Sequence, residues 1–121
     1  MKIEKILVVE DDSEVRWSLV TFLKKEGYWV SEAKDGLEAC GMLRKDKYDL
    51  IISDLKMPNF SGEELQDFCE KECIKSKFII ITAYGKVESF MKTMQKGAFE
   101  YLNKPVRLEE LLTLIKKIEE D

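Results

Sequence analysis

Histidine is absent from the 121 residues of the chain, and cysteine occurs only three times. Without histidine the chain can form neither a Ser-His-Asp nor a Cys-His catalytic group, and no His-ligated metal site. An odd number of cysteines argues against a disulfide framework and favours a reducing compartment. Cys69 and Cys73 are four residues apart, so we expect both on one helix face as small core residues rather than as metal ligands.

Long hydrophobic runs are also missing, and no segment approaches the roughly 20 apolar residues of a membrane span. The run 6–9 is too short for a signal peptide and ends at Glu10, Asp11 and Asp12. Acidic residues (24) outnumber basic ones (20), and the resulting net charge of −4 disfavours phosphate-driven binding to nucleic acid. We therefore expect a cytoplasmic protein without membrane attachment or direct nucleic-acid contact.

The length and composition predict one globular domain over residues 1–121. Hydrophobic residues make up 45% and charged residues 36% of the chain, which is typical of a globular protein rather than a disordered one. A chain of this length buries about two-thirds of its unfolded surface, which is enough for a hydrophobic core.

Short apolar runs alternate with amphipathic segments along the chain. The runs are continuous and rich in β-branched residues, which is typical of strands buried on both faces of a parallel sheet. We expect strands at 6–9, 28–31, 50–52, 78–81 and 99–102. Helices are expected between them and after them: one capped by Asp12 or Ser13 and ended by Gly27, one over 36–43, one begun by a capping box at 61–64, one over 87–95 closed by Gly97, and one from Leu108 onward.

Apolar residues at helical spacing identify the faces that these helices turn toward the core. The expected inward residues are Val15, Leu19, Phe22 and Leu23 in the first helix; Leu37 and Cys40 in the second; Leu65, Phe68, Cys69 and Cys73 in the third; and Leu108, Leu111, Leu112, Ile115 and Ile118 in the last. Five strand–helix units imply an α/β fold, a doubly wound five-stranded parallel sheet with helices on both faces.

Polar residues stand where four of the expected strands end. Glu10 and Asp11 follow the first strand, Asp54 the third, Thr82 the fourth and Lys104 the fifth. Ligands of such sheets bind outside the carboxyl ends of the strands, which share one edge. We therefore expect these five side chains to converge although they lie far apart in sequence.

Three carboxylates at one edge repel one another, by roughly 4 kcal/mol per pair at about 4 Å and an effective dielectric constant of 20. Lys104 supplies one compensating charge, and a hard divalent cation such as Mg²⁺ would supply two more. Acids, a cation, a hydroxyl and a lysine are together complementary to a phosphoryl group. A carboxylate can also act as the nucleophile that forms an acyl phosphate, and Asp54, at the end of the central strand, is the best candidate.

In this order the motifs resemble the receiver domain of two-component response regulators (CheY-like): Glu10-Asp11, Asp54 with Lys56-Met57-Pro58, Thr82-Ala83 and Lys104-Pro105. The resemblance covers essentially the whole chain. It implies a flavodoxin-like three-layer sandwich with strand order 2-1-3-4-5. It also implies a phosphorylation-activated signalling switch whose partner, a sensor histidine kinase, supplies the histidine that this chain lacks.

The resemblance implies a role for each acid at the expected site. Asp54 accepts the phosphoryl group in a Mg²⁺-dependent reaction. Asp11, Asp54 and the backbone carbonyl of Lys56 ligate Mg²⁺, and Glu10 contributes directly or through water. Lys104 contacts the phosphoryl group, and the Lys56 position tunes slow self-dephosphorylation.

The resemblance also implies how phosphorylation is sensed. Thr82 and the backbone amide of Ala83 contact the phosphoryl group. Tyr101 is the aromatic switch whose ring turns inward when Thr82 moves, although a ring that never moves would look the same in sequence. Tyr84 occupies a second position that tunes dephosphorylation, and the peptide bond before Pro105 is commonly cis.

A narrower likeness concerns Arg16-Trp17 and the segments 82–85 and 97–102. They look most like the receivers of nitrogen-regulation activators, which precede an ATPase domain and a DNA-binding domain. This implies transcription regulation, either as a receiver cut from a longer chain or as a stand-alone regulator. The switch would be read on the fourth helix, fifth strand and fifth helix, where a phosphorylation-dependent homodimer could also form.

Two other functions remain open from the sequence. A pseudo-receiver would keep the fold as a constitutive interaction module, but the five site residues argue against it. A Mg²⁺-dependent phosphatase on a similar fold would usually carry a second acid two residues after its nucleophile, where this chain has Lys56.

Asp12, the third acid after the first strand, is interpreted as a helix cap rather than as part of the site.

Overall fold

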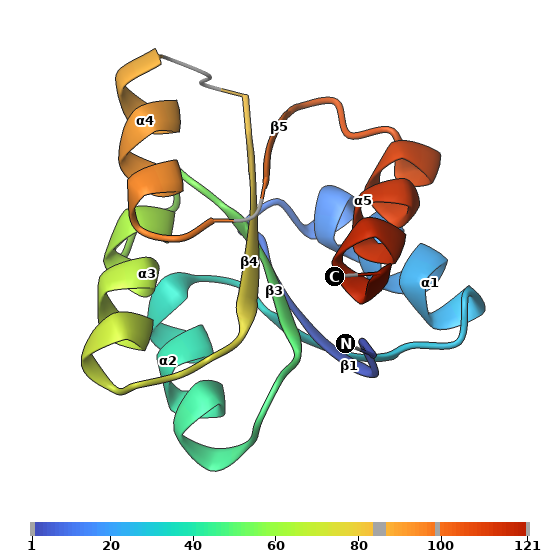
Figure 1. Cartoon of the computed structure of the whole chain (residues 1–121), viewed down its shortest axis with the longest axis horizontal. Helices are drawn as coiled ribbons and strands as arrows, with labels where there is room; N and C mark the ends of the chain where they lie inside the picture. Colours follow the sequence, from blue (N-terminus) through green and yellow to red (C-terminus); the bar gives the residue numbers. More distant parts are fainter. Residues whose placement is uncertain (1, 84–86, 99, 121) are drawn as a thin grey trace.

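Five strands and five helices alternate along the chain in the computed structural model, which describes residues 2–83, 87–98 and 100–120, with only the backbone of 87–90 (Figure 1). The strands are β1 (Lys5–Val9), β2 (Trp29–Ala33), β3 (Leu50–Asp54), β4 (Lys77–Thr82) and β5 (Glu100–Asn103). The helices are α1 (Ser13–Lys25), α2 (Gly36–Lys45), α3 (Gly62–Lys71), α4 (Val87–Gln95) and α5 (Leu108–Glu120). Each expected element is present, and the ends of the strands and helices lie within about two residues of the expected positions.

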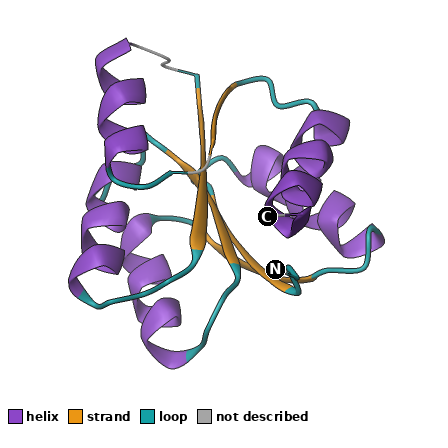
Figure 2. Cartoon of the chain, in the orientation of Figure 1, coloured by secondary structure: helices purple, strands orange, loops and turns teal. Residues whose placement is uncertain are grey.

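The strands form one sheet in the order β2-β1-β3-β4-β5, and every neighbouring pair is parallel. The predicted doubly wound α/β fold is therefore confirmed. Helices α1 and α5 lie on one side of the sheet, and α2, α3 and α4 lie on the other (Figures 1 and 2). The result is a three-layer sandwich, because parallel strands need crossover helices that cover both faces.

Alternate residues of each central strand pack into two separate cores, one on each face of the sheet. Ile6, Val8 and Ile52 join the core under α1 and α5. Leu7 and Ile51 join the core under α2 and α3. The strands read as unbroken apolar runs because a side-chain period of two then places an apolar residue in both cores.

The helix ends follow the expected signals. Asp12 is the N-cap of α1, and its side chain accepts hydrogen bonds from the amides of Glu14 and Val15. Ser61 and Glu64 form a complete capping box at α3. Gly27 follows α1 at φ 98°, a left-handed conformation that glycine adopts without strain.

Two predicted core positions are wrong. Leu37 is 56% exposed, because the buried face of α2 is formed by Gly36, Ala39, Cys40 and Leu43, and Leu37 lies about 100° around the helix from Gly36. Cys73 is exposed and lies beyond the end of α3.

Cys73 adopts the positive φ of 56° at the turn where α3 stops, a position that usually holds glycine. It therefore does not share a helix face with Cys69, which remains buried. In α5 the side chain of Leu112 is only half-buried, and Leu114, which the spacing analysis missed, fills the core. No helix in the described part of the chain is both long and apolar enough to cross a membrane.

Gly62 packs against the end of β3. A Cβ atom added there would lie 2.5 Å from the carbonyl oxygen of Asp54 and 3.0 Å from the Cα atom of Leu55, both of which are backbone atoms. The Gly62 amide also donates a hydrogen bond to the Leu55 carbonyl, 2.8 Å away. The loop between β3 and α3 can fold back under Asp54 only because residue 62 has no side chain.

We predict that Gly62→Ala lowers the free energy of unfolding by about 1–3 kcal/mol, because the backbone must shift to admit the methyl group. Gly41→Ala is the matched control, since a Cβ at Gly41 inside α2 meets no atom within 4 Å. It should stabilise the protein by about 0.5–1 kcal/mol through helix propensity. Urea denaturation measures both values, and equal effects would contradict this account of Gly62.

Candidate functional site

Strand register brings the expected site residues to one edge of the sheet. Val9 pairs with Ser53 in register, so Glu10 and Asp54 follow side by side at the edge. Thr82 pairs with Asn103, so Lys104 emerges next to the end of β4. The predicted convergence is seen for Glu10, Asp54, Thr82 and Lys104, and Asp11 lies with them.

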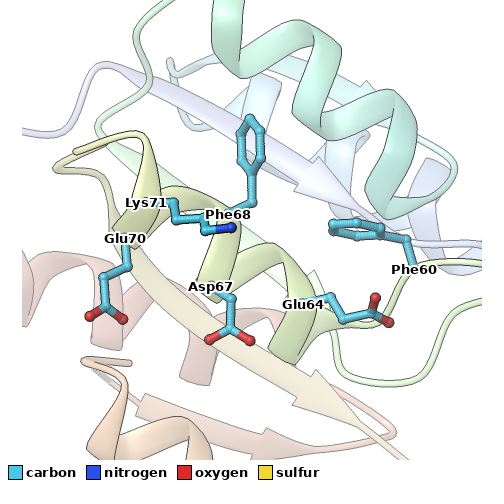
Figure 3. A pocket seen from close by; sticks show the side chains of 6 residues that line it. All are labelled: Phe60, Glu64, Asp67, Phe68, Glu70 and Lys71. Carbon is cyan, nitrogen blue, oxygen red and sulfur yellow. The ribbon is translucent and has the colours of Figure 1, made fainter.

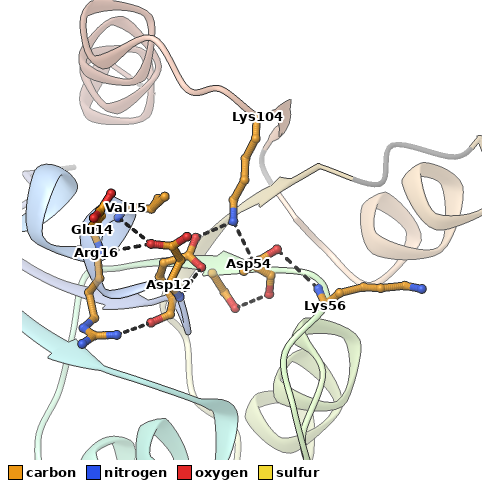
Figure 4. Close-up of polar contacts among 9 residues, drawn as sticks. Asp12, Glu14, Val15, Arg16, Asp54, Lys56 and Lys104 are labelled. Atoms are coloured by element: carbon orange, nitrogen blue, oxygen red, sulfur yellow. Dashed lines mark hydrogen bonds and ion pairs between the residues drawn. The ribbon is translucent and has the colours of Figure 1, made fainter.

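Lys104 bridges the two buried acids of this edge (Figure 4). Its Nζ atom lies 2.7 Å from Oε1 of Glu10 and 2.9 Å from Oδ2 of Asp54. The Glu10 side chain is fully buried and that of Asp54 is 7% exposed, whereas Lys104 keeps 19% of its side chain exposed. The partly exposed Lys104 side chain therefore extends to the two buried carboxylates and neutralises part of their charge. The surrounding apolar strands offer no such compensation.

Burial and the contact with Lys104 act in opposite directions on the ionisation of Glu10. Burial raises the pKa of Glu10 to about 7, although the Lys104 hydrogen bond and the Asp12 amide favour its charged form. Burial alone would lower the pKa of Lys104, but its hydrogen bonds and charge interactions with Glu10 and Asp54 outweigh this and raise it. Lys104 therefore stays protonated, while burial disfavours the charged form of Glu10.

The acids also fit a hard cation. Carboxylate oxygens of Glu10, Asp11 and Asp54 lie within 4.8 Å of one another, and Asp11 is exposed to solvent. Oxygen donors with access to water suit Mg²⁺, which keeps several waters when it binds protein carboxylates. Both Glu10 oxygens already have protein partners, since Oε2 accepts the Asp12 amide at 3.0 Å and Oε1 contacts Lys104.

The backbone around Asp54 holds its carboxylate in place. The Ser53 hydroxyl donates to the Asp54 carbonyl oxygen at 2.8 Å. The Leu55 amide donates to the Ile81 carbonyl of β4 at 3.1 Å. The Lys56 amide lies 3.4 Å from Oδ1 of Asp54, at the long limit of a hydrogen bond. The Lys56 side chain is exposed and points away from the acids (Figure 4).

Thr82 and Lys104 are joined through their backbones. The Lys104 amide donates to the Thr82 carbonyl at 2.8 Å, and the Thr82 side chain is buried at the end of β4. Ala83 follows as an exposed bend residue. The Lys104–Pro105 peptide bond is cis, as the family resemblance implied. Tyr84, which the sequence analysis also singled out, lies outside the described residues.

Tyr101 lies in β5, away from the acids. Its ring is half-buried and packs with the core under α2 and α3. Burial, with a smaller contribution from the Glu63 charge, raises the pKa of its hydroxyl. Tyr101 pairs in register with Ile80, which belongs to the same core, so the alternation of β4 places Thr82 on the same sheet face as Tyr101.

Sequence reasoning overlooked Arg16 as a neighbour of this site. Its guanidinium donates to the Glu10 carbonyl oxygen at 2.7 Å and to Oε1 of Glu32 at 2.9 Å. Arg16 had been noticed only as part of a family-like pattern. Its position one helical turn after Asp12 could have indicated the contact, because a long side chain there can reach the acidic loop.

A hollow of about 760 Å³ lies on the outer surface of α3 and is lined by none of the expected site residues (Figure 3). Two of its acids have other roles, since Asp67 pairs with Lys96 at 2.8 Å and Glu64 completes the capping box. Its rings, Phe60 and Phe68, pack partly into the core under α2 and α3. The strand edge, not this hollow, brings convergent charged groups together.

Known proteins are similar to this chain in sequence and in fold. The model of the response regulator receiver domain matches residues 6–116. The chain is 32% identical over 114 residues to the sporulation initiation phosphotransferase F of Bacillus subtilis (strain 168), covering 94% of this chain and 92% of that protein. It is 30% identical over 112 residues to the DNA-binding transcriptional regulator NtrC of Proteus hauseri, covering 93% of this chain but only 24% of that regulator.

Among solved structures, the beryllofluoride-activated receiver domain dimer of NtrC4 superimposes with a TM-score of 0.89 at 34% identity, and the match covers 96% of each chain. The similarity to NtrC and NtrC4 also agrees with the likeness to nitrogen-regulation receivers. With a family match that spans both strand-end acids and Lys104, the chain belongs to the response regulator receiver domain family.

Proposed function

We propose that this chain is a phosphorylation switch of a two-component system, with Asp54 as the phosphoryl acceptor. The observation that carries the proposal is that the Asp54 carboxylate both contacts the Lys104 ammonium, at 2.9 Å, and belongs to the acidic cluster that fits a cation. A carboxylate oxygen of Asp54 attacks the phosphorus of a phosphohistidine on a sensor kinase. The new O–P bond forms as the N–P bond breaks, and the kinase imidazole takes the electron pair.

The residues of the chain divide the remaining work. Asp11, Asp54 and the Lys56 carbonyl would hold Mg²⁺, and Glu10, whose oxygens are already engaged, would act on the ion through water. When bound, Mg²⁺ neutralises charge that develops on the phosphoryl oxygens. Lys104 exchanges its contact with Asp54 for one with the phosphoryl group.

Thr82 and the Ala83 amide also contact the phosphoryl group. The movement of Thr82 biases the position of Tyr101, which lies on the same sheet face. Phosphorylation adds one to two negative charges at the sheet edge and so shifts a two-state equilibrium. Water then removes the phosphoryl group slowly, at a rate that Lys56 and Tyr84 tune.

The wider setting is proposed from the family. The unit 1–121 is a receiver domain that acts in the cytoplasm and passes its state to an output domain or partner. The likeness to the DNA-binding regulator NtrC favours transcription regulation through ATPase and DNA-binding domains of a longer chain. The NtrC4 receiver is described as a dimer, which favours a phosphorylation-dependent homodimer through α4, β5 and α5.

Asp54→Asn tests the acceptor. We expect wild-type protein incubated with acetyl phosphate and Mg²⁺ to gain one phosphoryl group by mass spectrometry, and the variant to gain none, because an amide is not a nucleophile for this step. Circular dichroism checks that the variant is folded. Equal Mg²⁺-dependent labelling of the variant would sink the assignment, and a wild type that neither binds Mg²⁺ nor gains mass would indicate a pseudo-receiver. Turnover of a small phosphate ester would instead favour a phosphatase.

Asp11→Asn and Asp12→Asn form a matched pair for the metal site. We expect Asp11→Asn to weaken Mg²⁺ binding by about tenfold or more, because Asp11 would be a direct ligand. Asp12→Asn should change the dissociation constant by less than about twofold, because asparagine keeps the N-cap that Asp12 provides. Isothermal titration calorimetry measures both dissociation constants, and an equal loss of Mg²⁺ affinity in the two variants would contradict the assignment of Asp11 as the ligand.

Lys104→Met removes the ammonium and keeps most of the side-chain volume. Without Mg²⁺ we expect a loss of about 3 kcal/mol in the free energy of unfolding, because two buried carboxylates lose their shared partner. Saturating Mg²⁺ should recover more stability in the variant than in the wild type. Lys45→Met, an exposed lysine in the last turn of α2, is the control. Identical urea midpoints for Lys104→Met and wild type would contradict the bridge.

A further inference from the structure

Arg16 joins the acidic loop to Glu32 near the end of the neighbouring strand β2. It lies in the first turn and a half of α1, where its own amide donates to the Asp12 carbonyl at 2.9 Å. Its Nη1 atom donates to the Glu10 carbonyl oxygen at 2.7 Å, and its Nε atom donates to Oε1 of Glu32 in β2 at 2.9 Å. Only 18% of the Arg16 side chain is exposed, and its contact with the Glu10 carbonyl is partly buried, whereas the contact with Glu32 is exposed.

A contact at the Glu10 carbonyl affects the orientation of both Glu10 and Asp11. It belongs to the peptide unit between Glu10 and Asp11, and that unit is planar, so fixing its oxygen fixes the direction in which Asp11 begins. The 2.7 Å contact is a charge-assisted hydrogen bond and is stronger than a neutral one. On the other side of Glu10, its amide donates to the Ala33 carbonyl at 3.1 Å.

We propose that Arg16 is a positioning residue for the cation site, because it holds the Glu10–Asp11 peptide so that both carboxylates face one ion. The proposal rests on the metal site of the proposed function. A purely structural role would lie in the Arg16–Glu32 ion pair, but Glu32 is 51% exposed, and pairs that are open to water contribute little stability. The short hydrogen bond to the Glu10 carbonyl, in contrast, positions the acids that would bind the metal.

The planar guanidinium suits this task better than an ammonium group. It offers donors on separate nitrogen atoms of one rigid plane, so it can span from the Glu10 carbonyl to Glu32. A lysine at position 16 would present one compact charge on a flexible stem. Arg16→Lys should therefore keep the positive charge and lose the geometry.

The test is Mg²⁺ affinity by isothermal titration calorimetry in wild type, Arg16→Gln, Arg16→Lys, Glu32→Gln and Arg44→Gln. We expect Arg16→Gln and Arg16→Lys to bind Mg²⁺ about tenfold more weakly, which is the usual loss for residues that orient metal ligands. Glu32→Gln should lose less, because Arg16 can still reach the Glu10 carbonyl. Arg44→Gln is the control, since Arg44 pairs with Glu72 at the opposite end of the strands.

A readout in Mg²⁺-free protein tests positioning directly. The Asp12 amide donates to Oε2 of Glu10, so a loosened loop should speed hydrogen exchange at Asp12 in both Arg16 variants but not in Arg44→Gln. A drop in melting temperature with wild-type Mg²⁺ affinity and unchanged Asp12 exchange would overturn the proposal and leave Arg16 a structural residue. If Arg16→Gln does not fold, Arg16→Lys decides by the same criteria.

These measurements also separate this proposal from the proposed function. Mg²⁺ binding needs no phosphoryl donor, so a wild type that binds Mg²⁺ but never gains a phosphoryl group contradicts the switch and still tests Arg16. Wild-type phosphorylation combined with unchanged affinity in the Arg16 variants contradicts Arg16 alone. A wild type that binds no Mg²⁺ overturns both.

Discussion

One ammonium group, that of Lys104, holds two buried carboxylates together at the open edge of the sheet. Glu10 and Asp54 come from adjacent parallel strands whose register places them side by side, so the fold itself creates the repulsion that Lys104 relieves. Burial nevertheless disfavours the charged form of Glu10 and raises its pKa to about 7. Three clustered carboxylates with one lysine are suited to a divalent cation, and the net charge of the site changes when a phosphoryl group is added.

The rest of the molecule keeps these charges in place. Two hydrophobic cores pack against the central strands from both faces, and the carboxyl ends of those strands carry the acids. Gly62 lets the loop after β3 pass directly beneath Asp54. Arg16 ties the Glu10 carbonyl to β2 at the other end of the site. The site is therefore held by backbone contacts on both sides, whereas Lys104, which responds to the charge, enters on a long and partly exposed side chain.

Most of the fold follows from the sequence because its signals are local. The apolar runs, the capping box at Ser61 and the glycine after α1 each act within a few residues, and the strand order was supplied by the family resemblance. The predictions of buried positions failed where tertiary packing, rather than local sequence, decides which side chains are buried. Leu37 points outward because the placement of α2 buries Ala39 and Leu43 instead, and Cys73 takes a left-handed turn that its residue type does not favour.

The site was predictable in its membership but not in its contacts. Polar residues at strand ends identify Glu10, Asp54 and Lys104, since a parallel sheet gathers such residues at one edge. The pairing of both Glu10 oxygens with protein groups depends on side-chain geometry that no spacing rule contains. The same holds for the contact between Arg16 and the Glu10 carbonyl, which joins a side chain to a backbone atom.

The most direct test of the central claim is a crystal structure of the protein with Mg²⁺ and beryllofluoride. The account predicts one ion between Asp11 and Asp54, beryllofluoride bound to the Asp54 carboxylate, and the Lys104 ammonium moved from Asp54 onto a fluoride. Beryllofluoride bound elsewhere, or a Lys104 that stays on Asp54 while the ion occupies another place, would contradict it.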